Sequence, residues 1–311
     1  MIISMNRKIF VAFGLAALTG CANGDPIEAE HVQVCDGVWT DSDRAREIPV
    51  RIRMPMSGTA LPVVVYSHGL GGSVDAGTSW SEVWAEEGIA TVHIQHAGSD
   101  TAVLRSGRLR QAASGDQLIA RIGDVQFALD QVEAGVSIAD CDLGRAAADR
   151  AGVAGHSFGA HTTLAIAGQS FAGRMAGNDP RFRAAIALSP APPERAGPEA
   201  VAAAFGSITV PTMTITGTQD TVPINTVTAE DRILPYRALP PGDKYLLVFD
   251  GANHAAFSGN WRRRASAAPD PRIVRSVQQV TGLFWPPHHR SGSQLAVFEA
   301  GLSDDDRFEA K

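Results

Sequence analysis

Three residues of this chain have types and positions that suit nucleophilic catalysis. The first, Ser157, lies in Gly155-His156-Ser157-Phe158-Gly159, after a short apolar run and before a stretch with helical spacing. Such a turn is a nucleophile elbow, which holds the serine in a strained conformation and projects its hydroxyl. The helix that follows supports a developing negative charge at its N-terminus. The pattern alone is weak evidence, because the chain contains 31 glycines.

A carboxylate and a histidine follow the serine in the order that this chemistry needs. A serine hydroxyl requires a base to take its proton, and the base requires an acid to orient it. Asp220 and His254 each come shortly after an apolar stretch, so both belong in loops at the carboxyl ends of strands. The order predicts that Ser157, Asp220 and His254 act together. Asp250 remains the alternative acid, although its place in a tight turn suits a structural hydrogen bond better.

An oxyanion that forms on the substrate needs two backbone N–H groups to bind it. One is predicted at Phe158, the residue after the nucleophile. The other is predicted at Leu70, in the glycine-rich loop Ser67-His68-Gly69-Leu70-Gly71-Gly72, where Gly69 permits the turn. The alternative is that these glycines only end a strand.

The other histidines do not predict a metal site. His93 and His96 have a spacing that a metal could use, but no cysteine or carboxylate cluster near them completes a site. His156 is expected to pack beneath the elbow, and His161 to be a satisfied core or surface residue. We therefore predict no metal site at these histidines.

The elements that must position these residues alternate between strands and helices. Strands are predicted at 50–54, 61–66, 89–94, 151–154, 183–189, 212–216 and 244–249, and helices at 80–87 and 117–132. This alternation predicts an α/β fold with a mostly parallel central sheet and helices on both faces. The insertion at 190–207 is short, so a small or absent cap and an open site are expected.

Composition and charge limit the classes of protein. The 311 residues are 44% hydrophobic and 19% charged, which is typical of a soluble globular protein with an ample core. A net charge of −6, with no basic run longer than Arg262-Arg263-Arg264, argues against a nucleic-acid partner. The oligomeric state is left open.

The N-terminus has the pattern of an export signal. Two basic residues precede the apolar run 9–17, which is too short to span a bilayer. The run leads to Leu18-Thr19-Gly20-Cys21, which resembles a bacterial lipobox, where cleavage precedes a cysteine that becomes lipidated. An ordinary secretory signal is the alternative. By the same resemblance, Ala22 after the cysteine favours the outer membrane, so we expect an exported protein anchored to a membrane through Cys21.

Cysteine usage agrees with export. With Cys21 lipidated, Cys35 and Cys141 remain, and they form either one disulfide or two buried thiols.

Four motifs together resemble a known family. They are Ser67-His68-Gly69-Leu70-Gly71-Gly72, His96-Ala97-Gly98-Ser99-Asp100, Gly155-His156-Ser157-Phe158-Gly159-Ala160 and Asp250-Gly251-Ala252-Asn253-His254. They look like the bacterial dienelactone-hydrolase-like and platelet-activating-factor-acetylhydrolase-like branch of the α/β-hydrolases, whose relatives include the cutinase-like polyester hydrolases. The resemblance covers about residues 45 to 300, including Leu283-Phe284-Trp285. It implies the α/β-hydrolase fold and a serine esterase mechanism without metal or organic cofactor.

One position departs from this pattern. Dienelactone hydrolases proper have a cysteine nucleophile where this chain has Ser157, which favours hydrolysis of esters over dienelactones. The expected activity is cleavage of small-molecule carboxylic esters, with short acyl chains, through an acyl-enzyme intermediate. The alternatives are a serine peptidase or amidase on the same fold and a non-catalytic lipoprotein that binds a ligand.

The predicted organisation has four parts. A lipoprotein signal peptide occupies 1–20, and a tether and N-terminal segment 21–44. The α/β-hydrolase domain spans 45–300. An acidic tail at 301–311, with Asp304-Asp305-Asp306, is predicted to be disordered.

Overall fold

The computed structural model describes residues 32–107, 109–260, 269–285 and 302–311. The predicted signal peptide, Cys21 and the tether lie outside these residues, as does the arginine run at 262–264. Within the described ranges, no helix is both long and apolar enough to cross a membrane.

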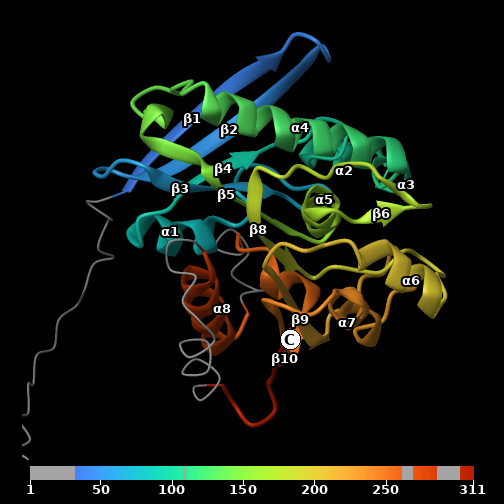
Figure 1. The fold of residues 1–311 in the computed structure, drawn as a ribbon. Helices are drawn as coiled ribbons and strands as arrows, with labels where there is room; N and C mark the ends of the chain where they lie inside the picture. The colour runs from blue at the N-terminus through green and yellow to red at the C-terminus, as the bar shows by residue number, and fades with distance from the viewer. Residues whose placement is uncertain (1–31, 108, 261–268, 286–301) are drawn as a thin grey trace, which may run out of the picture. The chain divides into compact units, whose positions relative to one another are not determined.

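A nine-stranded sheet occupies the centre of the described chain (Figure 1). In spatial order its strands are β1 (Val32–Asp41), β2 (Arg46–Pro55), β4 (Ala90–Ile94), β3 (Leu61–Ser67), β5 (Ala146–His156), β8 (Phe182–Leu188), β9 (Thr212–Gln219), β10 (Lys244–Asn253) and β11 (Arg307–Ala310). The strands from β4 to β10 in this order are parallel, whereas β1, β2 and β11 pair antiparallel at the edges. A separate ribbon pairs β6 (Ser170–Phe171) with β7 (Arg174–Met175). The mostly parallel sheet is as predicted.

Helices cover both faces of the sheet. On one face lie α4 (Gly115–Glu133), α5 (Phe158–Ala167) and α6 (Pro198–Phe205), and on the other lie α1 (Thr78–Glu86) and α8 (Pro271–Phe284). Strand β3 divides its side chains between them, because successive residues point to opposite faces. Val63 and Val65 pack with the first group, and Val64 and Tyr66 with the second. The remaining helical segments are α2 (Thr101–Ser106), α3 (Leu109–Ala112), α7 (Leu234–Ala238) and the 3-10 turns η1 (Leu143–Arg145), η2 (Glu230–Ile233) and η3 (His254–Phe257).

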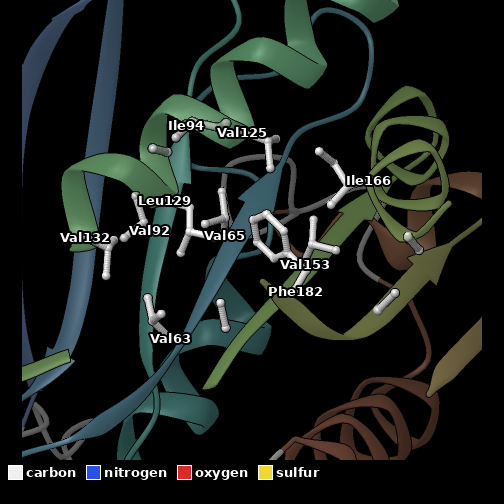
Figure 2. Packing of buried hydrophobic residues seen from close by; sticks show 14 of the residues in the cluster. Val63, Val65, Val92, Ile94, Val125, Leu129, Val132, Val153, Ile166 and Phe182 are labelled. Carbon is white, nitrogen blue, oxygen red and sulfur yellow. The ribbon is translucent and has the colours of Figure 1, made fainter. Parts of the chain in front are cut away.

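The apolar stripe of α4 anchors this helix on the sheet. Val125, Leu129 and Val132 recur at helical spacing and are at most 2% exposed. Figure 2 shows them beside Val65 and Val92 of the neighbouring strands. Burying a side chain of this size contributes about 1.5–3 kcal/mol. The stripe therefore fixes the position of α4, which carries two buried polar residues that matter below.

The sheet begins earlier than the predicted domain boundary at residue 45. Strand β1 lies inside the predicted N-terminal segment and pairs with β2 from Val32 opposite Pro55 to Asp41 opposite Arg46. Its apolar residues do not alternate regularly, so the local pattern did not reveal it. The strand is stabilised instead by pairing with β2 along ten residues.

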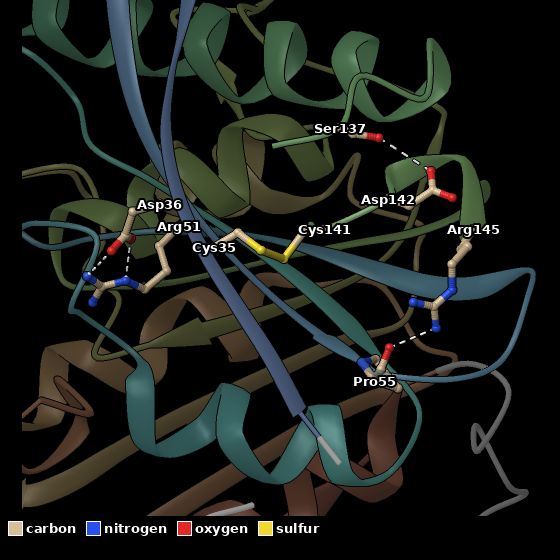
Figure 3. Close-up of a disulfide and its surroundings, with 8 residues drawn as sticks. All are labelled: Cys35, Asp36, Arg51, Pro55, Ser137, Cys141, Asp142 and Arg145. Atoms are coloured by element: carbon tan, nitrogen blue, oxygen red, sulfur yellow. Dashed lines mark hydrogen bonds and ion pairs between the residues drawn. A yellow bond between two sulfur atoms is a disulfide. The ribbon is translucent and has the colours of Figure 1, made fainter. Parts of the chain in front are cut away.

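A disulfide ties β1 to the rest of the chain (Figure 3). It joins Cys35 on β1 to Cys141 in the loop before η1, 106 residues later, so of the two possibilities left open by the sequence the structure has the disulfide. Both residues are buried. In the chain-entropy account, closing a loop of this length stabilises the folded state by about 5 kcal/mol relative to the unfolded chain.

The acidic tail is not disordered where the structure describes it, and the predicted boundary at 300 is therefore too early. Strand β11 pairs antiparallel with β10, and Phe308 stacks on Tyr245 with ring centroids 6.2 Å apart. The Asp306 side chain is 1% exposed, pairs with Arg272 and accepts a hydrogen bond of 2.9 Å from the Asp250 N–H. From the sequence, the acidic residues of the tail were expected to be solvated, because Arg272 and Asp250, the partners of Asp306, are distant along the chain.

Two short segments surround the loops at the carboxyl ends of the strands. The insertion at 190–207 contains α6, which buries Val201 and Phe205 in the core. A second segment, α2 with α3, was not predicted. Together with the start of α4 it borders an open pocket of about 320 Å³ lined by Gly98, Asp100, Ala102, Val103, Ser106, Gln111, Ala112 and Gln117.

Candidate active site

Ser157 lies at the tip of a sharp turn between β5 and α5. Its φ of 57° and ψ of −115° are strained for a residue with a side chain. A Cβ on Gly155 would overlap the Gly159 carbonyl, and a Cβ on Gly159 would overlap the Ser67 carbonyl. Both glycines are therefore required by close backbone approach. The elbow has the geometry that the sequence predicted.

The structure brings Ser157, His254 and Asp220 together. The His254 Nε2 atom lies 2.9 Å from Ser157 Oγ, and its Nδ1 atom lies 2.7 Å from Asp220 Oδ1. Asp220 directly follows β9 and His254 directly follows β10, so neighbouring parallel strands deliver the two side chains to one edge of the sheet. The Asp220 carboxylate is fully buried, whereas the His254 side chain is 17% exposed. The histidine thus reaches solvent, whereas its carboxylate partner does not.

Asp220 is held as a carboxylate by its surroundings. Burial alone would raise its pKa, but the hydrogen bond from His254 and the charges of His254 and Arg232 outweigh burial and hold the pKa below its usual value. Thr216 Oγ1 donates to the second carboxylate oxygen at 2.8 Å. The side chain is therefore fixed in the orientation that His254 needs.

Arg232 is a site residue that the sequence did not reveal. It is 2% exposed, and its Nε lies 2.8 Å from Asp220 Oδ1. The same guanidinium donates to the backbone carbonyls of Asp220, Ser189 and Pro190. It therefore joins the loop after β9 to the loop after β8. An arginine in a short 3-10 turn carries no sequence pattern that would have identified this contact.

Asp250, the alternative acid, lies elsewhere. It is exposed, and its Oδ1 accepts a hydrogen bond of 2.9 Å from Thr218 Oγ1. Asp220 is thus the carboxylate that the structure places against His254, and Asp250 makes a structural contact, as its position in the turn suggested.

His156 supports the turn from the side. Its Nε2–H donates to the His254 carbonyl at 2.9 Å, and the two rings are 4.7 Å apart. Burial and the charge of His254 lower the pKa of His156 to about 3, so its ring is neutral at physiological pH.

The two predicted oxyanion donors belong to segments that adjoin the serine. A Cβ on Gly69 would lie 3.4 Å from the Ser157 Cβ, so the glycine-rich loop runs directly beside Ser157. The loop is held by the Gly71 N–H, which donates to the Ser99 carbonyl at 2.8 Å. Within the described ranges, the N–H groups of Leu70 and Phe158 donate to no other group of the chain. Both are thus unengaged next to Ser157.

A second hydrogen-bonded chain of serine, histidine and aspartate side chains begins at Ser67, the first residue of this loop. Ser67 Oγ is 2.9 Å from His96 Nε2, and His96 Nδ1 is 3.0 Å from Asp124 Oδ2. These distances match those of the first chain, but all three residues are 0% exposed. No substrate reaches Ser67, so this chain is a structural link between β3 and α4. It also explains His96, for which no metal is needed.

His68, His93 and His96 are neutral internal hydrogen-bond acceptors. His68 Nε2 accepts from the His96 N–H at 3.0 Å, and His93 Nε2 accepts from Arg53 at 3.4 Å. His96 Nδ1–H faces Asp124, which leaves its Nε2 to accept from Ser67. Among the described residues, no group of three histidine, cysteine or acidic side chains could hold a metal ion.

We expect the protein to lose stability as the pH falls below about 6.5. Burial first, and neighbouring arginines second, hold the pKa of His68, His93 and His96 well below the usual value. Between pH 6.5 and the lowered pKa values of the folded protein, the unfolded chain therefore binds more protons than the folded one. The free energy of unfolding consequently decreases as the pH decreases. Each histidine lowers the free energy of unfolding by about 1.4 kcal/mol between pH 7.5 and pH 5.5, and the three together lower it by about 4 kcal/mol. Urea unfolding at both pH values measures this loss, and identical midpoints would contradict it.

Comparison with known proteins supports the architecture. No protein-family model and no curated protein matches the chain. A ferulic acid esterase from Streptomyces cinnamoneus is similar in structure, with a TM-score of 0.59 and 17% identity over 84% of this chain and 90% of that one. A cold-adapted esterase from an Arctic intertidal metagenomic library is 18% identical over 80% of this chain and 94% of that one, with TM-scores of 0.50 in its native form and 0.52 in its PEG-bound form. These likenesses show the fold: the chain has the α/β-hydrolase fold.

Proposed function

We propose that this protein is a serine hydrolase that cleaves carboxylic esters. The observation that carries the proposal is the hydrogen-bonded chain from Ser157 through His254 to Asp220, with the serine on a strained and partly exposed turn. The ester as substrate is supported by the two esterases that share the fold. The four sequence motifs support placing the chain in the dienelactone-hydrolase-like and platelet-activating-factor-acetylhydrolase-like branch.

The reaction proceeds in two steps. In the first, Ser157 Oγ attacks the ester carbonyl carbon while His254 Nε2 takes the hydroxyl proton. The tetrahedral intermediate collapses, the C–O bond to the alcohol breaks, and His254 returns the proton to the leaving alkoxide. In the second, water gives a proton to His254 and attacks the acyl carbonyl carbon. The bond to Ser157 Oγ then breaks, His254 returns the proton to Oγ, and the carboxylic acid leaves. Asp220 keeps the imidazole in the correct tautomer and stabilises its charged form.

The oxyanion of each tetrahedral intermediate binds to the N–H groups of Leu70 and Phe158. Both groups adjoin Ser157 and are free of other described partners. Phe158 is also the first residue of α5, so the positive end of the helix dipole adds to the stabilisation.

Short acyl chains are the proposed substrates. The insertion at 190–207 buries α6 in the core, which leaves little of it to enclose a long chain. We expect kcat/KM to be highest for p-nitrophenyl acetate or butyrate and to fall at least tenfold by the dodecanoate. The series is measured below the critical micelle concentration of the long esters. A maximum at eight carbons or more would contradict the short-chain specificity while leaving ester hydrolysis intact.

Two rivals give different results with the same protein. A peptidase or amidase would hydrolyse p-nitroanilides of the same acyl groups at rates comparable to those of the esters. A non-catalytic ligand-binding lipoprotein would turn over neither. Matched ester and anilide pairs therefore separate all three.

Export and lipid attachment at Cys21 complete the proposal. The lipobox-like sequence supports it, and the Cys35–Cys141 disulfide suits an oxidising compartment. The enzyme then acts on small-molecule esters at the outer membrane. Expression of Cys21→Ser tests this, because the wild-type protein should sediment with membranes and the variant should not; equal sedimentation would count against the anchor.

A further inference from the structure

A fully buried arginine contacts both segments that supply the oxyanion donors. Arg121 of α4 is 0% exposed. On the loop side, its Nη2 donates to the His68 carbonyl and, at 3.1 Å, to Ser67 Oγ. On the elbow side, its Cζ lies 4.6 Å from the centroid of the Phe158 ring. One guanidinium thus contacts both the glycine-rich loop that contains Leu70 and the side chain of Phe158.

Further contacts leave the guanidinium little freedom. Its Nη1 donates to Ser99 Oγ at 2.7 Å, and its Nε donates to Thr162 Oγ1 at 3.1 Å. The Ser99 carbonyl holds the Gly71 N–H, and Thr162 Oγ1 bonds the Phe158 carbonyl at 3.1 Å. Arg121 is therefore linked twice to each segment that carries an oxyanion donor. One link is a direct contact, and the other runs through Ser99 for the loop or through Thr162 for the elbow. The planar fork of an arginine suits this task, because its donors have fixed relative directions.

The charge of Arg121 is balanced only at a distance. Within the described ranges it makes no direct ion pair, and its donors face neutral oxygens. The connection to a carboxylate runs through Ser67 and His96 to Asp124, which also pairs with Arg44 and Arg46. Such a buried polar network is costly to assemble and favours one arrangement of the segments that it joins. It gives a role to the second serine–histidine–aspartate chain, which secures the fork of Arg121.

We propose that Arg121 is a positioning residue for the oxyanion hole, setting the distance between the Leu70 and Phe158 N–H groups. The inference rests on the proposed ester hydrolysis. Displacing one oxyanion donor weakens transition-state binding more than substrate binding, and losing a donor costs about 10²–10³ in kcat. Because the variants shift the donors without deleting them, we expect a smaller loss.

The test compares Arg121→Lys with a matched buried arginine. Lysine keeps the charge but not the fork, and we expect kcat to fall about 30-fold with KM within threefold. The inhibition constant of a trifluoromethyl ketone analogue of the best ester, which forms a tetrahedral adduct with Ser157, should rise by the same factor as kcat falls. The inhibition constant of the product carboxylate should stay within threefold of its wild-type value. Arg53→Lys, at a 6% exposed arginine that contacts His93, should leave all of these constants near wild type.

Other results would overturn the proposal. A kcat within twofold of wild type would do so, as would equal losses of affinity for the ketone and the product, which indicate general disorder of the site. If Arg121→Lys does not fold, Ser99→Ala decides: it removes one acceptor of the fork, and kcat should fall at least threefold with the ketone constant in parallel, whereas an unchanged kcat contradicts the role. Absence of ester turnover in the wild-type protein would instead refute the proposed function, so the two failures are distinct.

Discussion

Replacing Ser157 with alanine is expected to lower kcat for ester hydrolysis by about a millionfold, close to the background rate. Alanine removes the hydroxyl oxygen that lies 2.9 Å from His254 Nε2, so no acyl-enzyme should form. The described contacts of the Ser157 hydroxyl end at His254, and the fold should therefore survive the change. Steady-state turnover of the best short-chain ester, with thermal unfolding of the same sample, measures both effects.

A serine outside the site provides the control. Ser137 is exposed near the disulfide and is 3.4 Å from Asp142 (Figure 3). Ser137→Ala should keep wild-type kcat. Residual turnover of Ser157→Ala above one hundredth of wild type, in protein free of contaminating esterase, would mean that another group attacks the ester.

Replacing Asp220 with asparagine is expected to lower kcat by about 10⁴-fold. The amide can no longer hold the Nδ1–H tautomer of His254 or stabilise the charged imidazole. The change also leaves the 2% exposed Arg232 without its carboxylate, which costs about 3–5 kcal/mol of unfolding free energy. Activity is therefore measured well below the unfolding midpoint of the variant.

The matched control is Asp250→Asn, the same change at the alternative acid. Its side chain contacts Thr218 at the surface, so kcat should stay within twofold of wild type. Equal losses in the two variants, or a larger loss at Asp250, would contradict the assignment of Asp220.

The catalytic loops were predictable because their signals are local and repeat in the right order. Asp220 and His254 each follow an apolar stretch that predicts a strand. Ser157 lies between two glycines, which the close backbone packing of the turn requires. The parallel core strands were predictable for the same reason. Their continuous apolar runs reflect burial on both faces.

The parts that the sequence did not reveal depend on contacts between distant residues. Strand β11 is set by pairing with β10 and by the ion pair of Asp306 with Arg272, neither of which leaves a local pattern. Arg121 and Arg232 look like ordinary surface arginines in the sequence, yet both are buried by loops that come from elsewhere in the chain.

The two serine–histidine–aspartate chains show why residue types and distances are not sufficient. Ser67, His96 and Asp124 are spaced like the candidate triad, but they are sealed in the core and tied to arginines. Exposure separates them: His254 is reachable, and His96 is not. Only the folded structure carries this distinction.

The most direct test of the proposed function is covalent labelling with a fluorophosphonate, followed by peptide mass spectrometry. Ser157 Oγ, activated by His254, should bond to the phosphorus of the probe and displace fluoride, which leaves the phosphonyl group on Ser157 at one equivalent per chain, with loss of ester turnover in parallel. Labelling should disappear in Ser157→Ala and persist in Ser137→Ala. An unlabelled wild-type protein, or an adduct on a residue other than Ser157, would contradict the account.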